Sequence, residues 1–277
     1  MKKQVLFLVV GIIILISACK PVENRQEAGP IMPATEFTYT ITNDATNDYI
    51  LYLNNTTPGV MFSWDYAWGV SRKQMDTVQL LVPGTYTIKI TATTAGGLVT
   101  TTKEITVTQA KPGVFQEPEW TYLSNLAAGK TWIWDDTKPA PWGNGGYRGC
   151  TAPCWWAVSK TDLNGRGVGS DQMTFDLNGG RNLTLTAAQD PAAYKGVTKG
   201  SFDLTFGNTW PDWVDIGKLT TANVTIINGM QVNFSNQIEN NFYILKLTAT
   251  ELVLSAPEPG VTGAWGTAWF WMFKPKP

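Results

Sequence analysis

Aromatic rings and carboxylates must carry any chemistry that this sequence performs. Its 277 residues contain 13 Trp and 22 Asp plus Glu but no His. Without His, neither a Ser-His-Asp nor a Cys-His nucleophilic triad can form, and a zinc site with His ligands is impossible. The formal net charge of −1 gives no basic field for a phosphate backbone, so we expect no nucleic-acid partner.

Six tryptophans after residue 118 lie among glycine, proline and other turn formers, and they are Trp142, Trp155, Trp156, Trp210, Trp213 and Trp265. A tryptophan flanked in this way is not expected inside a regular strand, so it caps one end of a β-structure or turns a flat face outward. Such a face matches the axial C–H groups of a pyranose ring, and nearby polar groups can bond its hydroxyls. Candidate neighbours are Asn144, Tyr147, Arg148 and Asp212.

These ten residues form the predicted glycan-binding set. For each tryptophan taken singly, packing in the core is an equal alternative, but several together in a chain with only 16% charged residues favour glycan binding. We expect alanine at position 142, 156 or 213 to weaken glycan retention with little loss of thermal stability. A core tryptophan would show the opposite result.

Four other tryptophans alternate with apolar residues along expected strands, Trp132 and Trp134 in KTWIWD, and Trp269 and Trp271 in AWFWMF. Large aromatic side chains dominate the burial of apolar surface in protein cores. The alternation therefore predicts that these four pack in the core or beside it.

The carboxylates form no recognisable catalytic pair. Glycoside hydrolysis needs two carboxyls held roughly 5 to 10 Å apart, and the candidates are Asp135, Asp136, Asp171, Asp212, Asp215, Glu239 and Glu258. None gives the spaced Glu-x-Asp-x-x-Glu strand of laminarinase-like glycoside hydrolases, and most adjoin turn formers. The sequence thus favours binding without turnover, with a glycoside hydrolase or lyase as the alternative.

A metal or cofactor is not expected either. Asp162-Leu163-Asn164-Gly165 is similar to the start of a calcium loop, but Met173 stands where the closing acidic ligand belongs. A calcium site there is therefore only weakly indicated.

The N-terminal segment is typical of an export signal. Two lysines precede an apolar run, which ends in Ser17-Ala18-Cys19. The run is shorter than the roughly 20 residues that a spanning helix needs. The pattern resembles the lipobox of bacterial lipoproteins, which implies cleavage of residues 1–18 and acylation of Cys19. Residues 19–35 are polar and contain proline, which predicts a flexible tether.

An exported protein meets oxidising conditions, in which Cys150 and Cys154 of CTAPC can pair. A metal site would need two more soft ligands, and the sequence supplies neither His nor further Cys for it. We therefore predict a tight disulfide loop.

Short alternating runs separated by Gly, Asn and Pro indicate an all-β protein. In residues 36–109, Phe62-Ser63-Trp64-Asp65 precedes Pro83-Gly84-Thr85-Tyr86 and a Gly-ended turn at Gly96-Gly97. This order resembles a polycystic-kidney-disease (PKD) repeat, which implies an immunoglobulin-like sandwich serving as a stalk. Ala67-Trp68-Gly69-Val70 departs from the family's Gly-Asp-Gly turn.

A proline-bearing linker over residues 110–117 separates this region from residues 118–277. There, Asn178-Gly179 and Asn228-Gly229 predict hairpins between alternating strands. About eight to ten strands predict a larger β-sandwich or jelly roll, with a closed barrel as the alternative. Further strands are expected at Ser201 to Phe206, Asn241 to Leu247, Leu252 to Ser255 and Ala268 to Phe273.

The order of lipobox, tether, PKD-like domain and Trp-rich β-domain resembles the glycan-binding lipoproteins of Bacteroidetes polysaccharide-utilisation loci. That resemblance implies a non-catalytic protein, lipid-anchored in the outer membrane, that binds polysaccharide beside an outer-membrane glycan transporter. Display on the cell surface and on the periplasmic face both remain open. A structural envelope lipoprotein that binds other proteins is a further alternative.

Overall fold

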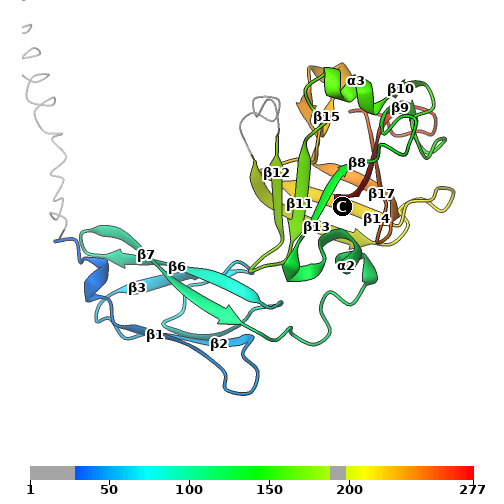
Figure 1. Ribbon diagram of the computed structural model, residues 1–277. Coiled ribbons are helices and arrows are strands. Elements are labelled where there is room, and N and C mark those ends of the chain that lie inside the picture. The colour runs from blue at the N-terminus through cyan, green and yellow to red at the C-terminus, as the bar shows by residue number, and fades with distance from the viewer. Residues whose placement is uncertain (1–28, 188–197) are drawn as a thin grey trace, which may run out of the picture.

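The computed structural model describes residues 29–187 and 198–277, which consist mainly of strands and loops (Figure 1). The expected all-β class is confirmed. The predicted signal peptide, Cys19 and residues 19–28 of the predicted tether lie outside the described residues. Within the described ranges, every helix is too short or too polar to cross a bilayer.

Residues 39–107 form two antiparallel sheets around a shared hydrophobic core (Figure 1). One sheet has the order β1–β2–β5 and the other the order β4–β3–β6–β7. The bounds are η1 (Ala34–Glu36), β1 (Tyr39–Asn43), β2 (Ile50–Asn55), β3 (Met61–Asp65), β4 (Val70–Ser71), β5 (Met75–Gln79), β6 (Gly84–Thr94) and β7 (Gly97–Val107). This first domain is an immunoglobulin-like sandwich.

Strand β6 has the alternation that its sequence predicts. Tyr86, Ile88 and Ile90 are buried, whereas Thr87 and Lys89 between them face outward. Ile90 lies opposite Trp64 of β3, so the buried rows of neighbouring strands meet in the core. The period of two in side-chain direction explains the pattern.

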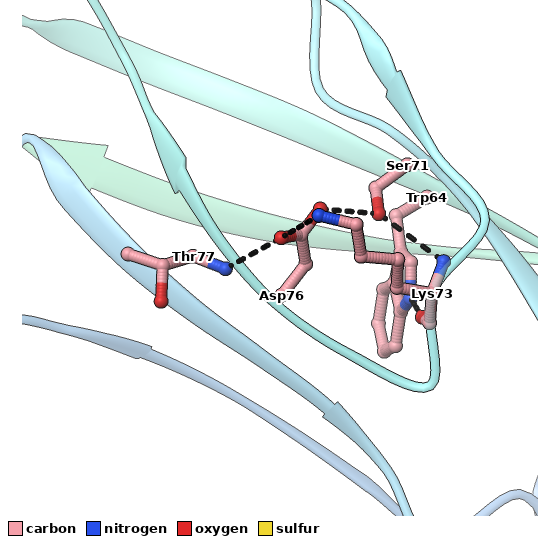
Figure 2. Close-up of polar contacts among 5 residues, drawn as sticks. All are labelled: Trp64, Ser71, Lys73, Asp76 and Thr77. Carbon is pink, nitrogen blue, oxygen red and sulfur yellow. Dashed lines mark hydrogen bonds and ion pairs between the residues drawn. The ribbon is translucent and has the colours of Figure 1, made fainter.

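A polar network fixes the connection from β4 to β5 (Figure 2). Asp76 accepts hydrogen bonds from the Ser71 hydroxyl at 2.6 Å and from the Thr77 backbone N–H at 3.0 Å, and Lys73 Nζ lies 3.0 Å from its Oδ1. The indole N–H of buried Trp64 donates to the Lys73 carbonyl at 3.1 Å. The turn is thereby tied to the core beneath it.

The second domain is a closed antiparallel barrel (Figure 1). Within the described residues, eight strands follow one another around the ring: β8 (Lys130–Trp134), β11 (Gln172–Asp176), β12 (Asn182–Thr186), β13 (Lys199–Phe206), β14 (Gly217–Ala222), β17 (Asn241–Leu247), β18 (Leu252–Pro257) and β19 (Thr267–Pro275). Phe273 of β19 pairs with Trp134 of β8 and closes the ring. The larger domain thus adopts the closed-barrel alternative within the all-β class.

One hairpin extends the barrel wall at one end. Strand β9 (Trp142–Gly146) pairs with the first half of β19, on the same edge to which β8 pairs further along. Strand β10 (Trp156–Val158) pairs with β9 and lies at the edge of the sheet. Sequence reasoning expected turns here, because the β9 segment contains three glycines.

Side chains fill the barrel, as expected for eight strands. Trp132, Trp134, Trp269 and Trp271 are each at most 1% exposed and contact the same core cluster. The prediction that these four are core residues is confirmed.

One local prediction differs from the structure, and one weakly indicated site is built differently. Asn228-Gly229 does not join two long strands, because only β15 (Met230–Gln231) follows it and pairs with β16 (Gln237–Ile238). Asp162 and its neighbours belong to helix α3 (Lys160–Gly165), where Ser159 and Asp162 form a capping box. No group of metal ligands occurs among the described residues, and the weakly indicated calcium loop is a helix start. The other helical segments are α2 (Pro118–Ser124), η2 (Leu126–Ala128) and η4 (Val232–Phe234).

The two domains contact each other through the turn that departs from the PKD pattern. Trp68 packs against the cores of both domains, 5.8 Å from the ring of Phe115 and 5.6 Å from the Arg181 guanidinium. The Asn178 side chain of the β11–β12 turn also accepts a hydrogen bond from the Thr85 backbone N–H at 3.1 Å. The first domain is thus docked on the barrel rather than only tethered to it.

Candidate aromatic binding surfaces

Three loops cover the outer face of β17, β18 and β19. They follow β9, β13 and β18. Their apolar residues, which include Tyr147, Trp213 and Val261, pack with Phe270 and Met272 of β19 into a second hydrophobic cluster outside the barrel. We call Tyr147, Trp210, Trp213, Tyr243 and Phe270 the outer cluster. The predicted disulfide between Cys150 and Cys154 is formed in the first of these loops.

The centre of the outer cluster is buried and cannot offer a stacking face. Tyr147 and Trp213 are 2% and 7% exposed, and their rings meet edge to face at 5.3 Å. The Tyr147 hydroxyl accepts a hydrogen bond from the indole N–H of Trp210 at 2.9 Å. Burial, and then the hydrogen bond with Tyr243, raise the pKa of Tyr147 well above its usual value. Tyr147 therefore stays neutral and structural.

Arg148 and Asp212 lie at the margin of the outer cluster. The Arg148 guanidinium stacks 4.4 Å from the centre of the half-buried Trp210 ring and forms an ion pair with Asp212. Asp212 is exposed. The predicted polar neighbours are thus present, but they bind each other across the two loops.

Two exposed indoles lie together beside this cluster. Trp155 is 52% exposed and Trp265 is 62% exposed. A methyl group placed on Gly146 would lie 2.6 Å from Cε3 of Trp265 and 3.4 Å from Cζ2 of Trp155. Both rings therefore rest against the same bare stretch of backbone. We call Trp155 and Trp265 the outer indole pair.

The backbone of Trp265 has a left-handed conformation, with φ at 66°. Its N–H donates to the Tyr147 carbonyl at 2.7 Å, and the Tyr147 N–H donates to the Gly266 carbonyl at 2.7 Å. Positive φ costs on the order of 1 kcal/mol for a bulky residue and persists only where the surroundings fix it. The fold thus holds an exposed apolar ring at a conformational cost, which is typical of a functional surface.

The remaining predicted residues lie in the β9–β10 hairpin itself. Trp142 is 2% exposed and stacks on Trp269 with ring centres 5.1 Å apart. Trp156 packs edge-on against Trp142 but is 39% exposed. The Asn144 side chain accepts a hydrogen bond from the Trp156 N–H at 3.1 Å, opposite it in the register.

The predicted set therefore separates into two surfaces and a buried part. Trp155 and Trp265 form one exposed surface, and Trp156 belongs to another. Trp142, Tyr147 and Trp213 are core residues, which corrects the expectation that they present rings to a ligand, and Trp210 is half-buried beneath Arg148.

Sequence reasoning missed two kinds of residue. Gly146 and Gly149 seat the Trp265 ring, since a methyl group on either would lie 2.6 Å from it. Arg166 lies over Trp156, with its Cζ 5.3 Å from the ring centre. The glycines of residues 143–149 are a signal that another segment approaches the backbone closely. Nothing near Arg166 in the sequence connects it to Trp156.

The carboxylates of the catalytic alternative are engaged in local structure. Asp135 accepts hydrogen bonds from Thr137, and the buried Asp215 accepts one from the Thr209 N–H at 2.7 Å. Glu239 accepts from Gln231 at 2.9 Å, and Glu258 accepts from the indole N–H of Trp269 at 3.0 Å. The Asp135 contact is that of a turn, whereas the other three join residues further apart in the barrel domain.

Comparison with known proteins gives a limited result. Scans against known families and against curated proteins found no match. Among solved structures, the chain is similar to the PKD1 domain of Vibrio anguillarum Epp, with 19% identity and a TM-score of 0.22 over 26% of this chain and 89% of that one. The immunoglobulin-like form of the first domain follows from its own two sheets.

Proposed function

We propose that this protein is a non-catalytic polysaccharide-binding lipoprotein, with the outer indole pair as its stacking surface. The main support is that Trp155 and Trp265 lie side by side, more than half exposed, against Gly146. An exposed apolar patch on a folded protein often marks a binding site. Flat indole faces suit the apolar faces of sugar rings.

The proposed mechanism combines weak contacts with repetition. Stacking on one indole contributes about 1 kcal/mol beyond the area it buries, so one molecule holds a sugar chain only modestly. A polysaccharide offers many repeats, and acylation at Cys19 would place many copies on one membrane. Retention then rises through effective concentration. We place the protein in the outer membrane, displayed at the cell surface beside a glycan transporter.

Affinity electrophoresis of the full-length chain through gels that contain soluble plant, algal or host polysaccharides tests the proposal. We expect Trp155→Ala and Trp265→Ala each to weaken retention about fivefold to tenfold, because about 1 to 1.4 kcal/mol of stacking is lost. Phe234→Ala is the matched control, since Phe234 is 40% exposed and belongs to η4, outside the loops that hold Trp155 and Trp265.

Three outcomes would contradict the proposal. Loss of retention in Phe234→Ala as large as in the tryptophan variants would mean that exposed aromatics act non-specifically. Release of new reducing ends from a retained polysaccharide would indicate a glycoside hydrolase. Failure to bind any polysaccharide, together with capture of envelope proteins, would favour the structural alternative.

A further inference from the structure

A second exposed indole, Trp156, lines a groove beside the β9–β10 hairpin. The groove runs between β10 and α3 and is lined by Trp156, Ala157, Val158, Thr161, Asp162 and Arg166. We call it the α3 groove. It is built from different side chains than the outer indole pair, since Trp156 begins strand β10 and Trp155 lies in the loop before it.

The Trp156 ring is supported from behind. Its ring centre lies 5.4 Å from that of Trp142 and 5.8 Å from that of Trp269, both in edge-to-face contacts. Trp142 and Trp269 are themselves stacked in the barrel core. Support of this kind fixes the ring, so a ligand that stacks on it loses little side-chain entropy from the protein.

Arg166 adds a cation to the same surface. It is exposed, and its Cζ lies 5.3 Å from the Trp156 ring centre and 5.7 Å from that of Trp142. Within residues 29–187 and 198–277, no acceptor bonds its guanidinium. A guanidinium stacked on an indole keeps its in-plane N–H groups available for a bidentate acceptor.

The carboxylate nearest to Arg166 has other partners. Asp162 accepts hydrogen bonds from the Ser159 hydroxyl at 2.7 Å and from the Ser159 N–H at 3.1 Å. The Ser159 hydroxyl lowers the pKa of Asp162 most, and the charge of Arg166 adds to the effect. Lys160 of α3 donates to the Asn164 side chain and the Gly169 carbonyl. The two charged residues that line the groove are Arg166 and Asp162, and Ser159 already bonds the Asp162 carboxylate.

We propose that the α3 groove binds an acidic sugar residue, with its ring stacked on Trp156 and its carboxylate accepting two N–H bonds from Arg166. The Trp156 indole suits the apolar ring of a uronic acid, and the Arg166 guanidinium, which has no acceptor within the described residues, suits its carboxylate. This inference rests on the proposed function, because it names one substrate class among polysaccharides.

Binding of alginate and polygalacturonate to the full-length chain, with methyl-esterified polygalacturonate as the neutral ligand, tests the inference. We expect Arg166→Gln to weaken binding of the two polyuronates about tenfold or more and to leave binding of the ester unchanged. Arg166→Lys keeps the positive charge but loses the two parallel N–H donors of the guanidinium. Its affinity for the polyuronates should therefore lie between those of the unmodified chain and of Arg166→Gln. Arg72→Gln is the matched control, because Arg72 is exposed in the first domain.

The results separate this inference from the proposed function. If Trp155→Ala weakens retention of a neutral glycan while Arg166→Gln leaves polyuronate binding unchanged, the α3 groove proposal is wrong and the proposed function stands. If polyuronate binding depends on Arg166 but not on the outer indole pair, the groove stands and the pair is not the platform. Equal binding of polyuronate and ester, or no binding of polyuronate, contradicts the groove proposal. Thermal unfolding of Arg166→Gln verifies that the variant is folded.

Discussion

Trp213 and Trp265 have similar sequence surroundings but different environments in the fold. Each lies in a loop of turn-forming residues that covers the outer face of the barrel, yet Trp213 is 7% exposed and Trp265 is 62% exposed. Trp213 points into the cluster under its loop, whereas a left-handed backbone holds Trp265 at the surface. Exposure, rather than the identity of the flanking residues, therefore separates the buried tryptophans from those proposed to face a ligand.

Trp213→Ala should destabilise the protein without a specific effect on glycan retention. Its ring centre lies 5.3 Å from that of Tyr147 and 5.4 Å from that of Tyr243. Removal of a buried tryptophan side chain lowers the free energy of unfolding by about 3 kcal/mol or more. Thermal and urea unfolding measure the loss, and Trp265→Ala, with an expected loss below about 1 kcal/mol, is the control. Equal losses in the two variants would mean that Trp213 is not a core residue in solution.

The burial of Trp132 and Trp134 could be predicted from the sequence, but the burial of Trp142 could not. Trp132 and Trp134 alternate with Ile133 in an ordinary strand pattern, so their burial could be predicted. Trp142 lies in Trp-Gly-Asn-Gly-Gly, which is nevertheless strand β9, because a covering loop approaches its bare backbone. A methyl group on Gly145 would lie 2.5 Å from Cys154 Sγ. Glycine here serves close packing rather than a turn.

At the scale of elements, local pattern identified most strands but not the short irregular ones. Strands β13, β17, β18 and β19 lie within about two residues of their expected bounds, because each carries an alternating or continuous apolar run. The hairpin predicted at Asn228-Gly229 is wrong, because the residues before it pack in the core without forming a strand. A turn signal sets local conformation, whereas pairing depends on what the flanking segments meet.

The Asp76 network of the first domain (Figure 2) predicts a pH dependence. The Ser71 hydroxyl, followed by Lys73 and the Thr77 N–H, lowers the pKa of Asp76 from its ordinary value of 3.8. A lowered folded-state pKa contributes stability that is complete above about pH 4 and is lost as the pH falls through the folded value.

Asp76→Asn should therefore lower stability by about 1 kcal/mol at pH 7, and the difference from the unmodified chain should shrink below pH 4. Thermal unfolding between pH 2.5 and 7 measures both effects. Asp65→Asn serves as the control, since Asp65 is exposed in the same domain. A difference that stays constant down to pH 2.5 would contradict the assignment.

At the scale of the whole molecule, two features have no local signal in the sequence. The barrel closes because β19 pairs with β8, segments more than 130 residues apart, and a periodic pattern cannot specify which strands meet. The contact between the domains likewise joins Trp68, Phe115 and Arg181 from three separate segments. The departure of Ala67-Trp68-Gly69-Val70 from the PKD pattern was visible, but its reason was not. The turn supplies the ring that docks on the second domain.

This docking predicts that the two domains tumble together. Trp68 donates its indole N–H to the Tyr86 hydroxyl at 3.2 Å and packs on Phe115 and Arg181, so Trp68→Ala removes the centre of the contact. Backbone ¹⁵N relaxation should give one rotational correlation time for both domains of the unmodified chain and two shorter ones for the variant. Val70→Ala is the control, because Val70 is exposed in the same turn. Independent tumbling already in the unmodified chain would mean that the contact is too weak to hold the domains, and the first domain would then act as a flexible stalk for the binding surfaces.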